Sequence, residues 1–191
     1  MEDLTRLVDA ARSGQAGAFA ALAEELRPNI FRLTSRFART AHDFDDLSQE
    51  ICLRLWKSLP RLHDSAAFLG WFKPLAVRAC HDWLRRRSSR QDREVSREAL
   101  ASLGELPPEP AAIADDTAER AAEIIHHALA TLKPDVRLVI TLLDLEEHTV
   151  AETAALTGWS EGNVRVRAHR ARTALKKLLF ANRLDMTNRP S

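Results

Sequence analysis

The chain has 191 residues, of which 45% are hydrophobic and 29% are charged, so fibrous and disordered classes are excluded. Its net charge of +1 excludes a uniformly basic coat for nucleic acid. No stretch approaches the roughly 20 uncharged apolar residues of a membrane span, and the start of the chain lacks the pattern of a secretory signal. Two cysteines without a paired framework fit a reducing compartment, so we expect a cytoplasmic protein with no membrane insertion.

Charge is distributed unevenly along the chain. Residues 76–90 carry five arginines and one aspartate, and residues 160–180 carry six basic residues and one glutamate. Between them, residues 101–117 hold four acidic residues, three prolines and no basic residue, a composition typical of a linker. We therefore predict one domain at 1–92, a linker at 93–117, a second domain at 118–182 and a tail at 183–191.

The first domain shows helical periodicity from its start. Apolar residues at helical spacing predict a first helix that stops at Ser13-Gly14, a second that ends before Pro28 and a third that opens at Pro28. A fourth helix is predicted from about Asp43 to Ser58. No segment alternates apolar and polar residues as a strand would, so the predicted fold class is all-α.

The fourth helix has two different faces. Its core stripe consists of Phe44, Leu47, Ile51 and Leu55, and the opposite stripe consists of Asp45, Gln49, Cys52 and Trp56. A tryptophan that points away from the core of its own helix is a candidate interface anchor. Coverage of Trp56 by another helix of the same small domain is an equally good interpretation of the pattern.

Aromatic residues and arginines then occur close together. The segment 68–72 contains three aromatic residues, and Trp83 precedes the arginine triplet 85–87. Stacking rings beside a cationic groove are what single-stranded DNA requires, although the same residues could form a core with a solubilising tail. Pro74 lies inside this expected helix, where it removes a hydrogen bond and favours a kink.

The second domain has the pattern of a helix-turn-helix. Periodicity predicts a helix from about Thr117 to Leu132, and Pro134 opens the next helix. A capping box at Thr149 starts a short helix that Gly158 ends, and Ser160 caps a longer basic helix. With about 100° per residue and Val164 inside, the outward face of that last helix holds Arg165, Val166, His169, Arg170 and Thr173, with Arg167 and Arg172 on its flanks.

Such a face suits DNA, because arginine can bind guanine, valine can contact the thymine methyl and flanking arginines can neutralise phosphate. A solvated charged surface is the alternative. Catalysis finds no support: Glu123 and His126 match one half of a di-iron motif whose second copy is absent, and no phosphate loop or zinc-protease motif occurs. We expect neither an enzyme nor any cofactor or metal.

These segments resemble one known family, the group IV or extracytoplasmic-function (ECF) sigma factors of bacterial RNA polymerase. The run Asp45 to Trp56, with its acidic pair, Gln-Glu and Trp, resembles regions 2.1 to 2.2, and Phe68 to Arg87 is similar to regions 2.3 and 2.4. Residues 129–178 resemble region 4. The resemblance covers nearly the whole chain and leaves no place for region 1.1 or a region 3 domain.

The resemblance implies two helical domains and three sets of contact residues. The set for the β′ clamp helices of core RNA polymerase is Asp45, Asp46, Leu47, Gln49, Glu50, Arg54 and Trp56. The set for the −10 element is Ser65, Phe68, Trp71, Arg78, Arg85, Arg86 and Arg87, with the loop from Leu62 to Phe68 capturing and helping to melt the DNA. The set for the −35 element is Asn163, Arg165, Val166, Arg167, His169 and Arg170.

The resemblance also implies that the polymerase β flap is a further partner. It implies control by an anti-sigma factor, commonly membrane-bound, which would hold the protein at the inner membrane. The chain departs from the family pattern at Cys52, where a large apolar residue is common, and at 75–78, where the basic positions are shifted. Two other functions stay open: a free-standing helix-turn-helix regulator, and a sigma mimic that switches partners without binding DNA.

Overall fold

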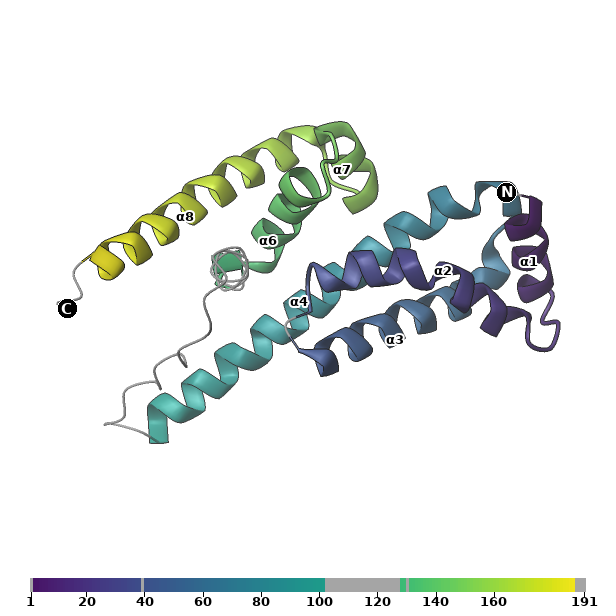
Figure 1. Cartoon of the computed structure of the whole chain (residues 1–191), viewed down its shortest axis with the longest axis horizontal. Coiled ribbons are helices and arrows are strands. Elements are labelled where there is room, and N and C mark those ends of the chain that lie inside the picture. Colours follow the sequence, from purple (N-terminus) through teal and green to yellow (C-terminus); the bar gives the residue numbers. More distant parts are fainter. Residues whose placement is uncertain (1, 39, 102–127, 130, 188–191) are drawn as a thin grey trace. The chain divides into compact units, whose positions relative to one another are not determined.

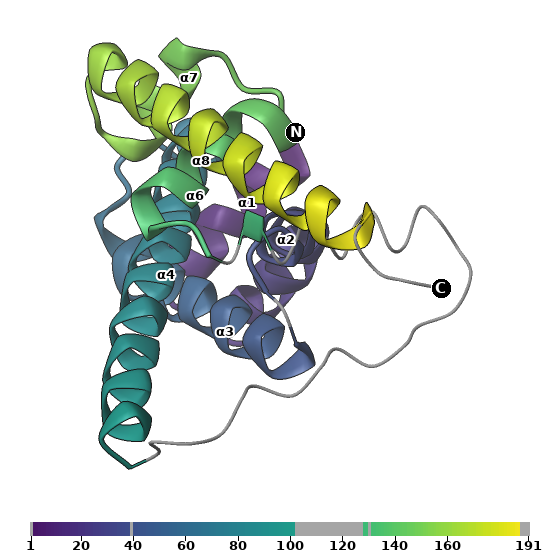
Figure 2. The ribbon, with the colours of Figure 1, turned by 90° about the vertical axis from the view of Figure 1, so that its left-hand side faces the viewer.

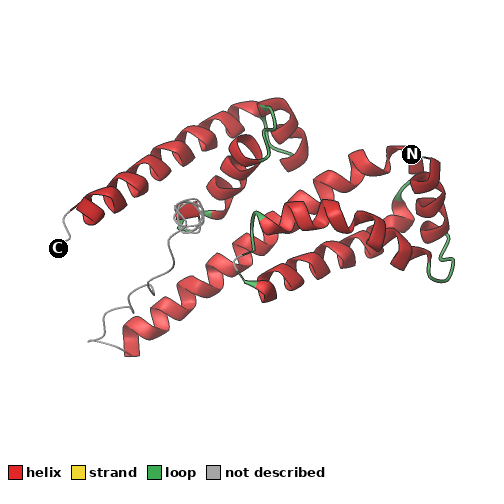
Figure 3. Ribbon diagram, viewed as in Figure 1, coloured by secondary structure: helices red, strands yellow, loops and turns green. Residues whose placement is uncertain are grey.

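The structure, a computed structural model, describes residues 2–38, 40–101, 128–129 and 131–187. These residues form helices joined by short turns and contain no β-strand (Figure 3), which confirms the all-α prediction. The chain divides into two compact units, one built mainly from the N-terminal helices up to Leu84 and the other mainly from the C-terminal half. Among the described residues, no helix combines the length and apolar character needed to cross a membrane.

Three helices begin the N-terminal unit: α1 (Glu2–Arg12), α2 (Ala18–Ser35) and α3 (Ala41–Ser58). Helix α1 packs against α2, and α2 packs against α3, as Figures 1 and 2 show from two directions. Their apolar stripes meet in a core whose fully buried side chains include Val8, Leu22, Leu26, Phe37, Leu47, Ile51 and Leu55. Burial of these stripes holds the helices together, since each apolar side chain removed from water contributes roughly 1.5–3 kcal/mol.

Helix α2 runs through Pro28 without ending there, so the prediction of two separate helices is wrong. Proline lacks an amide hydrogen and therefore leaves the carbonyl four residues earlier, that of Glu24, without its helical donor. Both Pro28 and Glu24 are exposed, so water can bond this carbonyl. The helix continues because Leu22, Leu26 and Ile30 on its other face are buried.

A capping box starts α3 two residues before the predicted position. The backbone amide of Asp43 donates to Thr40 Oγ1 (3.1 Å), and the backbone amide of Thr40 donates to Asp43 Oδ2 (3.3 Å). Two amides that have no helical acceptor are thereby bonded. Aspartate in place of the more usual glutamate explains why the sequence pattern placed this start too late.

Two short 3₁₀ turns, η1 (Leu59–Arg61) and η2 (Ser65–Ala67), connect α3 to α4 (Phe68–Ala101). Pro74 lies inside α4 and does not end it, because the carbonyl that it frees belongs to exposed Gly70. The helix continues past residue 92, where we placed the end of the first domain. The predicted boundary at 117/118 lies outside the described residues, and the one at 182/183 falls inside helix α8 (Glu161–Thr187).

The C-terminal half contains α6 (Pro134–Ile140), a π-helical turn η3 (Thr141–Leu145), α7 (Val150–Thr157) and α8 (Glu161–Thr187). Pro134 opens α6 as predicted, and α6 packs against α8. A small core joins the buried side chains of Leu129, Ile140 and Ala171, with Leu132, Val136, Leu145 and Leu175 packed around it. Most of the helix predicted at 117–132 lies outside the described residues.

The turns on either side of α7 have left-handed backbone. Gly158 has φ of +79° and its amide donates to the Ala154 carbonyl (2.9 Å), so this glycine ends α7 as predicted. Glu147, before α7, has φ of +56° without being glycine. Thr149 directly precedes α7 and Ser160 directly precedes α8, in agreement with the predicted helix starts.

Candidate functional site

One side of α3 is exposed and combines acidic, polar and apolar groups. The exposed residues on this side, which we call the α3 face, are Asp45, Asp46, Gln49, Leu53 and Trp56. Trp56 is 57% exposed, so the interpretation that another helix of the same domain covers it is wrong, and its role as an interface anchor stays a prediction. Leu53 is exposed as well and was missed, although the helical period places it directly opposite Ile51.

Three of the residues predicted to bind polymerase, Leu47, Glu50 and Arg54, do not belong to this face. The side chain of Leu47 is 0% exposed, so it is part of the core between the helices. Arg54 turns toward α4, where its Nη1 donates to Asp82 Oδ2 (2.8 Å) while its Nε donates to Glu50 Oε1 (2.8 Å). Leu47 and Arg54 therefore stabilise the unit from within.

The contacts of Arg54 also affect its titration. Burial lowers the pKa of the guanidinium, but the hydrogen bonds to Asp82 and Glu50 raise the pKa by more, so the net shift is upward. The cation thus stays charged while only partly exposed. Its two carboxylate partners come from α3 and α4, so this group holds the two helices in register.

A second exposed surface follows α4. Its residues, which we call the α4 face, are Trp71, Arg78 and Arg85. They are spaced by seven residues and therefore lie on one side of the helix. Arg78 and Arg85 are exposed and Trp71 is half-buried. Of the other predicted arginines, Arg86 is exposed and Arg87 is half-buried. The structure therefore aligns one aromatic ring with two cations, which is the combination that single-stranded DNA requires.

Two residues predicted to touch the −10 element are buried. Phe68 packs beneath the α4 face, with its ring centroid 6.2 Å from that of Trp71 and stacked at 5.7 Å on Phe72. Ser65 is only 8% exposed, and its hydroxyl donates to Asp9 Oδ1 (2.5 Å). These side chains support the surface from inside and do not form part of it.

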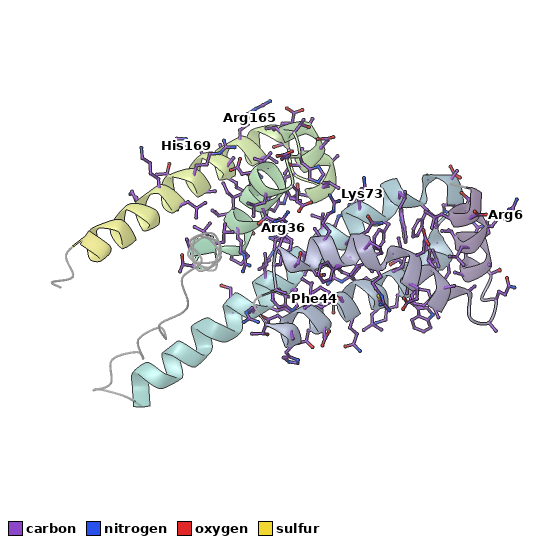
Figure 4. All side chains as sticks on the ribbon, in the orientation of Figure 1. Arg6, Arg36, Phe44, Lys73, Arg165 and His169 are labelled. Atoms are coloured by element: carbon purple, nitrogen blue, oxygen red, sulfur yellow. The ribbon has the colours of Figure 1, made fainter. Side chains whose placement is uncertain are left out.

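The outward face of α8 has the composition that helical geometry predicted. The exposed residues on this side, which we call the α8 face, are Arg165, Val166, His169, Arg170 and Thr173. Figure 4 shows Arg165 and His169 pointing away from the helix on the same side. Asn163 is exposed too, and Arg165 Nη2 forms an ion pair with Glu161 Oε2 one turn earlier (2.7 Å). The inward residues Val164, Ala168 and Ala171 are buried.

Arginines on the flanks of α8 attach it to its neighbours. Arg167 Nη2 pairs with Asp135 Oδ2 of α6 (3.2 Å), and Arg172 pairs with Asp144 of η3 through two bonds of 2.7 and 3.2 Å. The bonds to Asp144 raise the pKa of Arg172. Arg167 is half-buried, so this predicted −35 residue bonds α6 and is not part of the exposed α8 face. The Glu123 and His126 pair lies outside the described residues.

Two family models match the chain. The model described as sigma-70 region 2 matches residues 22–90, and the model described as sigma-70, region 4 matches residues 122–175. The first match contains the α3 face and the α4 face, and the second contains the α8 face. Each exposed surface thus lies in a segment that these families define.

Curated relatives and solved structures agree with these matches. The chain is 30% identical to the ECF RNA polymerase sigma factor SigM of Mycobacterium tuberculosis, over 87% of this chain and 80% of that protein. It is 28% identical to the ECF RNA polymerase sigma-E factor of Escherichia coli K12, over 88% and 90%. CnrH, solved in complex with the cytosolic domain of CnrY, shares the fold with a TM-score of 0.56 at 24% identity, over 93% and 97% of the two chains.

A further structure with this fold is the sigma factor RpoE of Bartonella quintana, solved in complex with the anti-sigma factor NepR. Its TM-score is 0.51 at 20% identity, over 86% of this chain and 98% of that one. The family models, the relatives and the helical architecture all lead to one assignment. The chain belongs to the ECF RNA polymerase sigma factors, which are transcription initiation factors and not enzymes.

Proposed function

We propose that this sigma factor divides promoter recognition among its three exposed faces. The α3 face docks on the β′ clamp helices of core RNA polymerase. The loop from Leu62 to Phe68 and the α4 face capture and help melt the −10 element, and the α8 face reads the −35 element. The observation that carries the proposal is the exposure of Trp56 among acidic residues in a region 2 segment, because a large exposed aromatic is the usual anchor of an interface.

The chemistry of the two DNA surfaces supports this division. On the α8 face, guanidinium groups can hold guanine O6 and N7 in the major groove, and Val166 can contact a thymine methyl. On the α4 face, Trp71 can stack on an unpaired base while Arg78 and Arg85 follow the phosphates. The exposed Arg165 and Arg170 also argue against a sigma mimic that does not bind DNA.

Replacing Arg165 or Arg170 by alanine is expected to relax the −35 sequence preference. A bidentate base contact supplies roughly 1–3 kcal/mol of discrimination, whereas a phosphate contact supplies none directly. The measurement is transcription by core polymerase plus this protein from a library randomised at −35, with the RNA 5′ ends sequenced. Initiation at a defined set of promoters, only when core is present, tests the function itself.

Lys176 and Lys177 provide the matched control for this experiment. Both are exposed on the same helix, beyond the α8 face, so alanine at either position should weaken binding evenly across the library. Unchanged −35 preference in both arginine variants would show that the α8 face does not read bases.

We infer further that an anti-sigma factor holds this protein inactive by covering the α3 face. RpoE of Bartonella quintana, which shares this fold, was solved in complex with the anti-sigma factor NepR, and the apolar groups of the α3 face would gain from being covered. A membrane-bound partner would keep the sigma factor at the inner membrane. Pull-down from the native host followed by cross-linking should recover a second partner joined to the α3 face under non-inducing conditions. Recovery of core polymerase alone, with and without induction, would contradict this inference.

A further inference from the structure

The end of helix α1 is bonded to the loop that connects α3 to α4. Helix α1 contacts both η1 and η2, and Figure 1 shows it beside the segment that joins them. Arg12 Nη1 donates to the carbonyl oxygens of Leu62 (2.8 Å) and His63 (3.3 Å). Ser65 Oγ donates to Asp9 Oδ1 (2.5 Å), and the same oxygen pairs with Arg12 Nη2 (3.1 Å). We call this set of bonds the α1 latch.

The bonds of the latch form a closed circuit between α1 and the loop. Arg12 holds two successive carbonyls, Asp9 holds the hydroxyl of Ser65, and the ion pair joins Arg12 to Asp9. Every bond involves a charged group, and hydrogen bonds of this kind are shorter and stronger than neutral ones. Because α1 bonds three of the four residues 62–65, rotation of the loop backbone is restricted while the latch is closed.

The latch decides which side of the loop faces outward. Leu62 and Ser65 point inward and are buried, whereas Arg61, His63 and Asp64 are exposed. Asp64 Oδ1 accepts a hydrogen bond from the Ala66 amide (2.9 Å), which orders the exposed part from the other end. Leu62 itself is extended and ends η1, so its carbonyl has no helical donor, and Arg12 supplies the partner that this polar group needs.

We propose that Asp9 and Arg12 are positioning residues for recognition of the −10 element. They hold the loop so that its exposed side meets the DNA in one conformation, and the strand binds without first ordering the loop. This inference depends on the proposed role of the loop from Leu62 to Phe68 in capturing the −10 element. Ser65, which the sequence placed among the DNA contacts, acts in the latch instead.

The test measures how well the complete holoenzyme distinguishes the −10 strand from strands with single substitutions. Arg12→Ala and Ser65→Ala are expected to reduce that discrimination about tenfold, the effect of losing one hydrogen bond to a charged group. The combined variant should lose less than the product of the two, because both act through the same loop. Arg12→Lys keeps the charge beside Asp9 and should recover part of the loss.

Arg27→Ala is the matched control. It removes an ion pair with Glu24 of the same i,i+3 spacing (2.7 Å) that lies within α2, so −10 discrimination should stay at the wild-type value. Affinity for core polymerase and −35 preference should stay unchanged in every latch variant. A loss of core affinity in these variants would overturn the proposal, because it would mean that the latch merely holds the unit together.

The outcome also separates the latch from the function on which it depends. Normal −10 discrimination in Arg12→Ala and Ser65→Ala, together with a loss in Trp71→Ala, overturns the latch and leaves the proposed function standing. Normal discrimination in Trp71→Ala and Arg78→Ala as well overturns the proposed −10 surface, and the latch proposal with it. Should Arg12→Ala fail to fold, Ser65→Ala removes a single bond and decides the question alone.

Discussion

Alanine in place of Trp56 is expected to lower the affinity of this sigma factor for core RNA polymerase at least about 30-fold, because truncating an interface anchor typically costs ~2 kcal/mol or more. The side chain is 57% exposed, so its removal should change the free energy of unfolding by less than about 0.5 kcal/mol. Equilibrium binding of labelled protein to purified core, with urea unfolding of the same sample, measures both quantities.

Phe31→Ala is the control for this variant. Phe31 is 58% exposed on α2 and is in contact with Phe44, with ring centroids 5.2 Å apart. It offers an aromatic side chain of almost equal exposure outside the α3 face. Core affinity should therefore survive its truncation, and equal losses in the two variants would mean that Trp56 is not a specific anchor.

Leu47→Ala should have the opposite effect, with a large loss of stability and little direct effect on docking. Leu47 is fully buried, and removing a buried leucine side chain typically costs about 2–5 kcal/mol through lost burial and a remaining cavity. Urea unfolding should show this decrease, while the folded fraction should still bind core. Wild-type stability combined with weak core binding would return Leu47 to the docking surface.

The inward and outward faces of α3 and of α8 could be predicted from the sequence, because they depend only on the period of a helix. Once Leu55 or Val164 is taken as buried, the direction of every neighbouring residue follows from 100° of rotation. Burial in the structure agrees at nearly every position of α3 and of α8 as far as Lys177, the last residue of α8 whose burial is described. The continuation of α2 through Pro28 could not be predicted this way, because it depends on whether the freed carbonyl meets water.

Three polar residues of the predicted contact sets form bonds within the fold that the sequence did not indicate. Each of them bonds a carboxylate that is distant in the chain: 56 residues away for Ser65, 28 for Arg54 and 32 for Arg167. A local pattern contains no information on such partners. A resemblance to a family also places residues that touch a target and residues that hold the fold in the same motif, and only the three-dimensional contacts separate them.

The ion pair between Arg165 and Glu161 affects the thermodynamics of DNA binding. Salt dependence arises because cationic side chains displace counterions from the phosphates. The guanidinium of Arg165 is already paired with the carboxylate of Glu161, 2.7 Å away. When Arg165 binds a guanine, it exchanges this carboxylate acceptor for the acceptor atoms of the base. An exposed pair of this kind costs only a few tenths of a kcal/mol to open. Arg165 can therefore contribute to the choice of sequence while adding little to the ionic-strength dependence, which then depends on the other cationic side chains of the proposed promoter-binding surfaces.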